Sequence, residues 1–152
     1  MKHYIIDGNN LIGKIRVLKS LHKKSKIKSA EKLAFIVGRF FTGKNAAVNL
    51  YFDGFQSEVI KVSGIKIIHS GNKTADEKIK SEIEKSSNPR NIILVTSDNN
   101  LAEFGRVCSC MVVPSESFSK TLLSSDKIDD EQIKIEEINN QANFKKIFGV
   151  ED

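Results

Sequence analysis

The chain has 152 residues, of which 39% are hydrophobic and 28% are charged. A chain of this size can form one domain with a sizeable core, and its composition is not that of a disordered protein. No apolar run approaches the roughly 18 residues of a membrane helix, the first residues show no signal-peptide core, and the two cysteines are too few for a disulfide framework or a four-thiolate zinc site. These features exclude a membrane span, a secreted mini-protein and a zinc ribbon, and they predict a cytoplasmic protein.

Positive charge is concentrated in residues 14–44, which hold ten Lys and Arg residues and one acid, a net +9. Residues 126–152 hold eight acids and four lysines, a net −4. A dense basic segment attracts polyanions, and nucleic acid is the commonest such partner. A solvated lysine-rich face explains the same charge equally well. Charge alone leaves both interpretations open.

Strands and helices are predicted to alternate along the chain. The predicted strands are residues 2–6, 46–52, 64–69, 91–96 and 107–113. The predicted helices are residues 11–23, 30–42, 75–85, 100–106, 116–123 and 129–148. Residues 23–28 are predicted to be a loop, with Ser29 as the N-cap of the helix that follows, and Thr74 and Glu77 form a capping box. The alternation predicts an α/β fold with a central, mostly parallel sheet of about five strands.

Four aspartates are predicted to lie at one edge of this sheet. Asp7, Asp53 and Asp98 follow strands, and Asp76 lies in the first turn of the helix after the third strand. The carboxyl ends of parallel strands meet at one edge, where ligands bind in open α/β folds. Each acid alone is explained by a cap or a turn, but together they predict an oxygen-ligand site for Mg²⁺ or Mn²⁺.

Five short motifs resemble those of one family. Residues 4–12 are similar to the Asp-x-x-Asn opening of NYN domains, which are PIN-like ribonucleases, and the YacP-like group is the nearest match. Residues 51–54 resemble the family's second-strand acid, and residues 73–76 resemble its Thr-Ala-Asp helix start. Residues 95–98 resemble its Thr-Ser-Asp strand end, and residues 113–118 resemble its closing Ser-x-x-Phe segment. The resemblance covers about residues 2–120 in order.

The resemblance implies a PIN-like three-layer α/β/α fold and an endoribonuclease that depends on Mg²⁺ or Mn²⁺. Residues 1–123 are then the YacP-like nuclease domain. Residues 124–152 lie outside the family's motifs, and their charge and pattern predict a helical acidic segment packed on this domain or extending from it. The resemblance implies that Asp7, Asp76 and Asp98 hold the metal, that Asp53 supports them, and that Asn10 orients Asp7 or touches a phosphate.

The expected partner is RNA, and the YacP-like group includes nucleases of ribosome-associated mRNA. The residues expected to bind RNA are Lys14, Arg16, Lys23, Lys24, Lys26, Lys28, Lys73 and Ser97.

Two other functions are consistent with parts of the pattern. A non-catalytic RNA- or ribosome-binding module would need the basic segment but has no use for clustered carboxylates. A small-molecule phosphohydrolase would use the acids, but residues 7–9 are not Asp-x-Asp. A cleavage assay with and without EDTA separates nuclease from binding module, and turnover of a phosphomonoester would favour the phosphohydrolase.

The remaining candidate residues are expected to be mainly structural. His69 closes the third strand and could meet RNA, whereas His3 and His22 are predicted to be structural. Cys108 and Cys110 alternate with Ser109 on the fifth predicted strand, so they are expected to share one of its faces. The phenylalanines expected in the core are Phe40, Phe41, Phe52 and Phe104.

Overall fold

The computed structural model describes residues 1–56 and 59–125. The acidic segment predicted at residues 124–152 lies outside this part of the chain, apart from its first two residues, which end the last described helix. Within the described residues, no helix is both long and apolar enough to cross a membrane.

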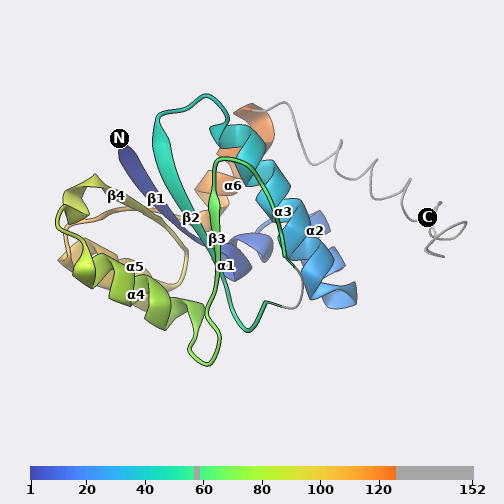
Figure 1. Cartoon of the computed structure of the whole chain (residues 1–152), viewed down its shortest axis with the longest axis horizontal. Coiled ribbons are helices and arrows are strands. Elements are labelled where there is room, and N and C mark those ends of the chain that lie inside the picture. The colour runs from blue at the N-terminus through green and yellow to red at the C-terminus, as the bar shows by residue number, and fades with distance from the viewer. Residues whose placement is uncertain (57–58, 126–152) are drawn as a thin grey trace, which may run out of the picture.

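A single parallel sheet forms the centre of the molecule (Figure 1). Its strands are β1 (Lys2–Asp7), β2 (Ala46–Phe52), β3 (Lys66–His69), β4 (Ile92–Val95) and β5 (Met111–Val113). In the described part of the chain five strands pair in the order β3-β2-β1-β4-β5, and every pair is parallel. The predicted fold class is therefore confirmed. Because β1 is the central strand, the residues that follow it lie between the ends of β2 and β4.

Helices cover both faces of the sheet, which gives three layers (Figure 1). On one face lie α1 (Gly8–Ile12), α2 (Arg16–Lys24), α3 (Lys26–Phe41) and α6 (Ser115–Ser125). On the other lie α4 (Ala75–Lys85) and α5 (Asn99–Val107), and a 3₁₀ turn, η1 (Pro89–Asn91), precedes β4.

Apolar residues point alternately to the two helical layers. Ile5 packs with α4 and α5, whereas Ile6 packs with the layer of α1, α2, α3 and α6, and both are fully buried. All four residues of β4 are buried in the same way. This two-sided burial explains why the strands read as continuous apolar runs, since parallel strands are covered on both faces.

The predicted helix over residues 11–23 is wrong, because two helices occupy that region. Residues 13–15 separate α1 from α2, and the predicted loop at 23–28 shrinks to Ser25. Ser25, not Ser29, caps α3: its hydroxyl accepts a hydrogen bond from the Lys28 backbone N–H at 3.2 Å. Ser29 is buried inside α3 and donates to the Lys26 carbonyl at 2.9 Å.

The region of the two cysteines also differs from the prediction. Helix α5 runs to Val107 and β5 begins only at Met111. Between them Ser109 has a φ of 75°, which lies in the left-handed region and turns the chain. Cys108 and Cys110 therefore lie in a turn and do not share the face of a strand.

The close approach of α1 to β2 generates the first prediction. A Cβ atom on Gly8 would lie 2.4 Å from the Tyr51 carbonyl oxygen and 2.7 Å from Cε1 of Phe52. Gly8→Ala is therefore expected to lower the free energy of unfolding by about 1–3 kcal/mol, since a packed interior must shift to admit the methyl group. Urea unfolding followed by circular dichroism measures this loss.

Gly13→Ala is the matched control. Its Cβ would meet nothing closer than 3.4 Å, and its φ of −64° suits any residue. We expect its free energy of unfolding to stay within about 0.5 kcal/mol of the wild-type value. Equal stability of the two variants would contradict the close approach of α1 to β2.

Candidate active site at the carboxyl edge of the sheet

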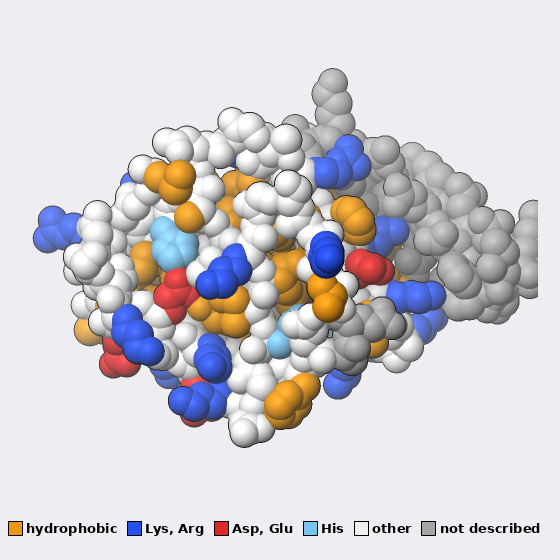
Figure 2. Space-filling model, viewed as in Figure 1, with side chains coloured by type: hydrophobic (Ala, Val, Ile, Leu, Met, Phe, Trp, Pro, Cys, Tyr) orange, Lys and Arg blue, Asp and Glu red, His pale blue; other side chains and the backbone are white. Residues whose placement is uncertain are grey.

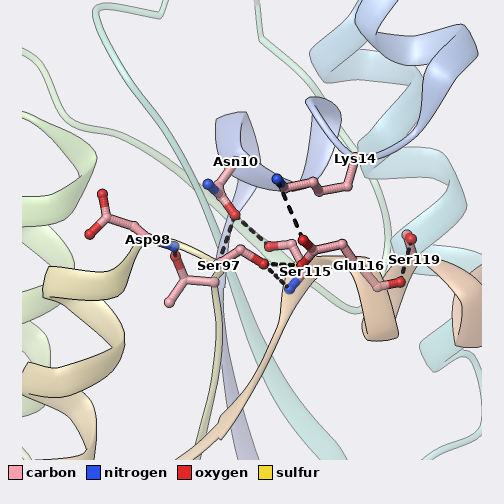
Figure 3. Close-up of polar contacts among 8 residues, drawn as sticks. Asn10, Lys14, Ser97, Asp98, Ser115, Glu116 and Ser119 are labelled. Carbon is pink, nitrogen blue, oxygen red and sulfur yellow. Dashed lines mark hydrogen bonds and ion pairs between the residues drawn. The ribbon is translucent and has the colours of Figure 1, made fainter.

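Helix α1 joins the ends of β2 and β4 through two asparagine side chains. The Asn9 side-chain oxygen accepts a hydrogen bond from the Asp53 backbone N–H at 2.8 Å. The Asn10 oxygen accepts from the Ser97 backbone N–H at 2.8 Å and from the Ser115 hydroxyl at 2.7 Å (Figure 3). The segments after β2 and β4, and the start of α6, are thereby fixed around the end of β1.

Asp7 ends the central strand and is largely enclosed. Its Oδ2 atom accepts a hydrogen bond from the Thr96 hydroxyl at 3.0 Å. The pKa of Asp7 is raised from its ordinary 3.8 to about 6, chiefly by burial and to a smaller extent by the nearby charges of Asp53 and Asp98, while hydrogen bonds from Thr96 and the Asn10 backbone oppose the rise. Asp53 and Asp98 are therefore each close enough to Asp7 to disfavour its negative charge.

Asp53 and Asp98 each also accept a hydrogen bond from the first turn of a helix. The Asp53 Oδ1 atom accepts from the Ala75 backbone N–H at 2.8 Å, at the start of α4. Asp98 is the N-cap of α5 and accepts from the Leu101 N–H at 2.9 Å. These contacts fix the position of each carboxylate. Each of the two aspartates therefore binds the start of a helix and also lies at the carboxyl edge of the sheet.

Asp76 lies in the first turn of α4, as predicted, and its Oδ2 atom is 3.1 Å from Nζ of Lys80. Its charge is not among those that raise the pKa of Asp7. Glu77 completes the predicted capping box with Thr74, and the hydrogen bonds from Thr74 lower the pKa of Glu77. Asp76 directly follows Ala75, whose backbone N–H binds Asp53, so it lies next to Asp53 in the first turn of α4.

A divalent cation suits the donors at this edge, although the acids do not form a complete ligand shell. Among the described residues, no three His, Cys, Asp or Glu side chains are arranged to hold a metal ion. Mg²⁺ usually keeps several waters and binds through one or two carboxylates, so it does not require such a group. Oxygen atoms are the donors that a hard cation prefers. Such a cation would also reduce the repulsion that Asp53 and Asp98 exert on the charge of Asp7.

Glu116 is a further acid at this edge that the sequence pattern did not single out. Its carboxylate makes a short hydrogen bond with the Ser97 hydroxyl, and its Oε2 atom lies 3.6 Å from Nζ of Lys14 (Figure 3). These contacts, with the Ser97 hydroxyl first, lower the pKa of Glu116. The signal was its place just after a strand, at the start of a helix, within the Ser-x-x-Phe motif.

The residues predicted to bind RNA fall into two groups. Lys14 and Ser97 lie in the contact network of Glu116. Arg16 begins α2, Lys23 and Lys24 end it, and Lys26 and Lys28 lie in the first turn of α3, while Lys73 precedes the cap of α4. Figure 2 shows Lys and Arg side chains spread over one face of the molecule, with hydrophobic side chains exposed between them.

The two histidines predicted to be structural both have partners. Nε2 of His3 lies 3.2 Å from a carboxylate oxygen of Glu82. Nδ1 of His22 lies 2.7 Å from the Ser29 hydroxyl. The second contact joins α2 to α3 next to Ser25.

The sheet order, the three layers and the acids beside the central strand define a PIN-like α/β domain. The chain belongs to the family of YacP-like NYN domains, whose model matches residues 4–149. Two solved structures of Rae1 (YacP) from Bacillus subtilis share its fold. One is similar with a TM-score of 0.70 and 20% identity, over 97% of this chain and 88% of that chain. The structure of the W164L mutant gives a TM-score of 0.67 and 19% identity, over 94% and 85%. No curated protein matches the chain.

The raised pKa of Asp7 generates the second prediction. The folded state holds the Asp7 proton up to about pH 6, whereas the unfolded chain releases it near 3.8. Folding is therefore favoured by this group below pH 3.8, and that stability is lost as the pH rises through 6. The shift from 3.8 to about 6 corresponds to about 3 kcal/mol. In EDTA, Asp7→Asn should gain stability over the wild type as the pH rises from 4 to 7.5.

Urea unfolding of both proteins across this pH range measures the difference. Glu103→Gln removes an exposed carboxylate of α5 and is the control, with an expected change within about 0.5 kcal/mol throughout. A constant difference between Asp7→Asn and the wild type would show that Asp7 is ionised as readily as in the unfolded chain.

Proposed function

We propose that this protein is an endoribonuclease that hydrolyses RNA phosphodiester bonds with a Mg²⁺ or Mn²⁺ ion held at the carboxyl edge of the sheet. The observation that carries the proposal is the enclosed Asp7 carboxyl, whose pKa is raised by burial and by Asp53 and Asp98, acids that follow two other strands. Burial and the two nearby charges make the ionised form of Asp7 unfavourable in the folded chain. A cation bound beside Asp7 would offset this cost. Family membership supports this, because YacP-like NYN domains belong to a PIN-like nuclease family that generally depends on divalent metals.

Each acid has a proposed role that agrees with its contacts. Asp7, Asp53 and Asp98 would hold the ion, with Asp76 close by in the first turn of α4. The ion, when bound, supplies charge neutralisation at the phosphate and lowers the pKa of water. Thr96 holds the carboxylate of Asp7 in place through its hydroxyl. Asn10 is a positioning residue, because its side-chain oxygen is already used by Ser97 and Ser115.

The basic residues of α2 and the start of α3 would hold the RNA backbone without reading bases. Phosphate contacts of this kind are weakened by salt, since counterions are released on binding. The proposed substrate is RNA, including ribosome-associated mRNA, and cleavage of that mRNA would take place in the cytoplasm.

The third prediction concerns cleavage. Asp7→Asn and Asp98→Asn are each expected to slow Mg²⁺- or Mn²⁺-dependent cleavage of single-stranded RNA by about a hundredfold or more, because they remove charge that stabilises the reacting groups. Asparagine is also a good N-cap, so Asp98→Asn keeps the cap of α5. Gel analysis of cleavage with and without EDTA measures the effect.

Glu103→Gln changes the net charge by the same amount outside this edge, so it controls for a general gain in RNA affinity. It is expected to cleave at the wild-type rate. Unchanged turnover in both aspartate variants would refute the proposed site.

The fourth prediction is a metal effect that does not require activity. A cation that binds only the folded state raises its stability by mass action. Saturating Mg²⁺ or Mn²⁺ should therefore raise the melting temperature of the wild type, measured by calorimetry without RNA, and should raise that of Asp7→Asn much less. The same increase in both proteins would place the ion elsewhere.

A non-catalytic RNA- or ribosome-binding module is the second candidate. The net +9 of residues 14–44 favours it, as does the lack of three side chains arranged for a metal among the described residues. RNA binding that survives EDTA, together with no cleavage under any divalent ion, would select this candidate.

A further inference from the structure

A pocket of about 430 Å³ opens next to the carboxylate edge. It is enclosed by α1, the end of α2, the start of α3 and the ends of β2 and β3. Asp53 belongs both to its lining and to the acids around Asp7. A molecule in this pocket would therefore touch the site of the proposed chemistry.

The walls of the pocket combine flat apolar groups with a cation. Phe52 lines it, and its ring centroid lies 5.7 Å from that of His69, which also lines it. Phe55, at the mouth, is 73% exposed, which is unusual for so large an apolar ring. Lys26 adds a positive charge. Aromatic faces next to a lysine are the groups on which unstacked bases and their phosphates bind.

The two histidines of the pocket offer hydrogen-bonding groups. The Ser29 hydroxyl donates its single proton to the Lys26 carbonyl, so Nδ1 of His22 must donate to Ser29. In the neutral ring of His22, Nε2 is then the acceptor. Nδ1 of His69 is buried and has no hydrogen-bond partner within residues 1–56 and 59–125. Burial lowers the pKa of His69, which favours its neutral ring with one donor and one acceptor.

We propose that this pocket binds one unpaired nucleobase of the RNA, beside the nucleotide whose phosphate lies at the carboxylates. The inference rests on the proposed function and extends it to the kind of substrate. A base inside a duplex cannot enter the pocket, so the substrate is single-stranded RNA. The base stacks on Phe55, and its edge pairs with the ring of His22, which also lines the pocket.

The experiment uses the full chain in EDTA, so that binding is measured without cleavage. The probe is a short, fluorescein-labelled single-stranded oligoribonucleotide, with a series of copies that each carry one abasic site. Anisotropy titrations compare the wild type with Phe55→Ala and with Phe35→Ala. Phe35 is an exposed phenylalanine of α3 that does not line the pocket, so it is the matched control.

Loss of one stacked base is expected to weaken binding about tenfold. We expect Phe55→Ala to show this loss on the intact RNA, and the wild type to show it when one particular position is abasic. The two losses should not add, because both remove the same contact. Phe35→Ala should bind as the wild type does, and a duplex of the same sequence should bind more weakly than the single strand. Because Phe55 is mostly exposed, its replacement leaves the core intact.

The outcome separates this inference from the proposed function, because cleavage of the same RNA with Mg²⁺ is measured independently. Cleavage with equal affinities of Phe55→Ala and Phe35→Ala, or with no sensitive abasic position, would overturn the nucleobase pocket and leave the nuclease. Base-dependent binding through Phe55 without cleavage would support the pocket in a binding module.

Discussion

The carboxylate edge depends on hydrogen bonds that the side-chain oxygens of the two asparagines of α1 accept. Asn9 holds the segment after β2 and Asn10 holds the segment after β4. Each asparagine oxygen accepts a backbone N–H that lies beyond the ladder of the sheet, and Asn10 also accepts the Ser115 hydroxyl at the start of α6. Because β1 is the central strand, one short helix reaches both neighbours. The spacing of the acids is thus set by amide groups rather than by the acids themselves.

The surroundings of Asp7 disfavour its negative charge, unlike those of Asp53 and Asp98. Asp53 and Asp98 accept hydrogen bonds from helix N-termini, which favour negative charge. Asp7 is enclosed, and burial together with the other two charges makes its ionised form unfavourable. The apolar core on both faces of β1 must offset this cost, with Ile5 and Ile6 fully buried just before it. A residue that opposes folding where it sits is better explained by chemistry than by stability.

Much of the fold could be predicted because its signals are local. Apolar runs marked the strands, and the Thr74–Glu77 capping box marked the start of α4. The strand order could not be predicted from the sequence, because no local sequence feature indicates that β1 is the central strand. Ser29 resembled a cap, but its contact with His22 buries it within α3. The turn at Ser109 was missed because its positive φ occurs at a residue without the usual glycine signal.

For the candidate site, prediction was limited by contacts between distant segments. Three of the four acids were found from strand ends and Asp76 from a helix start. The contact that brings the start of α4 to Asp53, however, joins segments far apart in the chain. Glu116 was overlooked because Lys14 and Ser97, its partners, are far from it in the chain. The pocket could not be predicted either, because its lining residues come from segments far apart in the chain. In the sequence, Phe52 is typical of a core residue.

The turn after β2 connects the two proposed sites physically. The Gly54 backbone N–H donates to the Ser70 hydroxyl at 3.0 Å, and its carbonyl accepts from the Gly71 N–H at 2.8 Å, so the turn is anchored to the end of β3. Asp53 on one side of this anchor points to α4, where it accepts from Ala75, and Phe55 on the other side lies at the mouth of the pocket. A single residue, Gly54, therefore separates the acid from the residue that carries the stacking ring. A nucleotide bound at the ring would lie next to the segment that carries the acid, because two hydrogen bonds fix that segment to the end of β3.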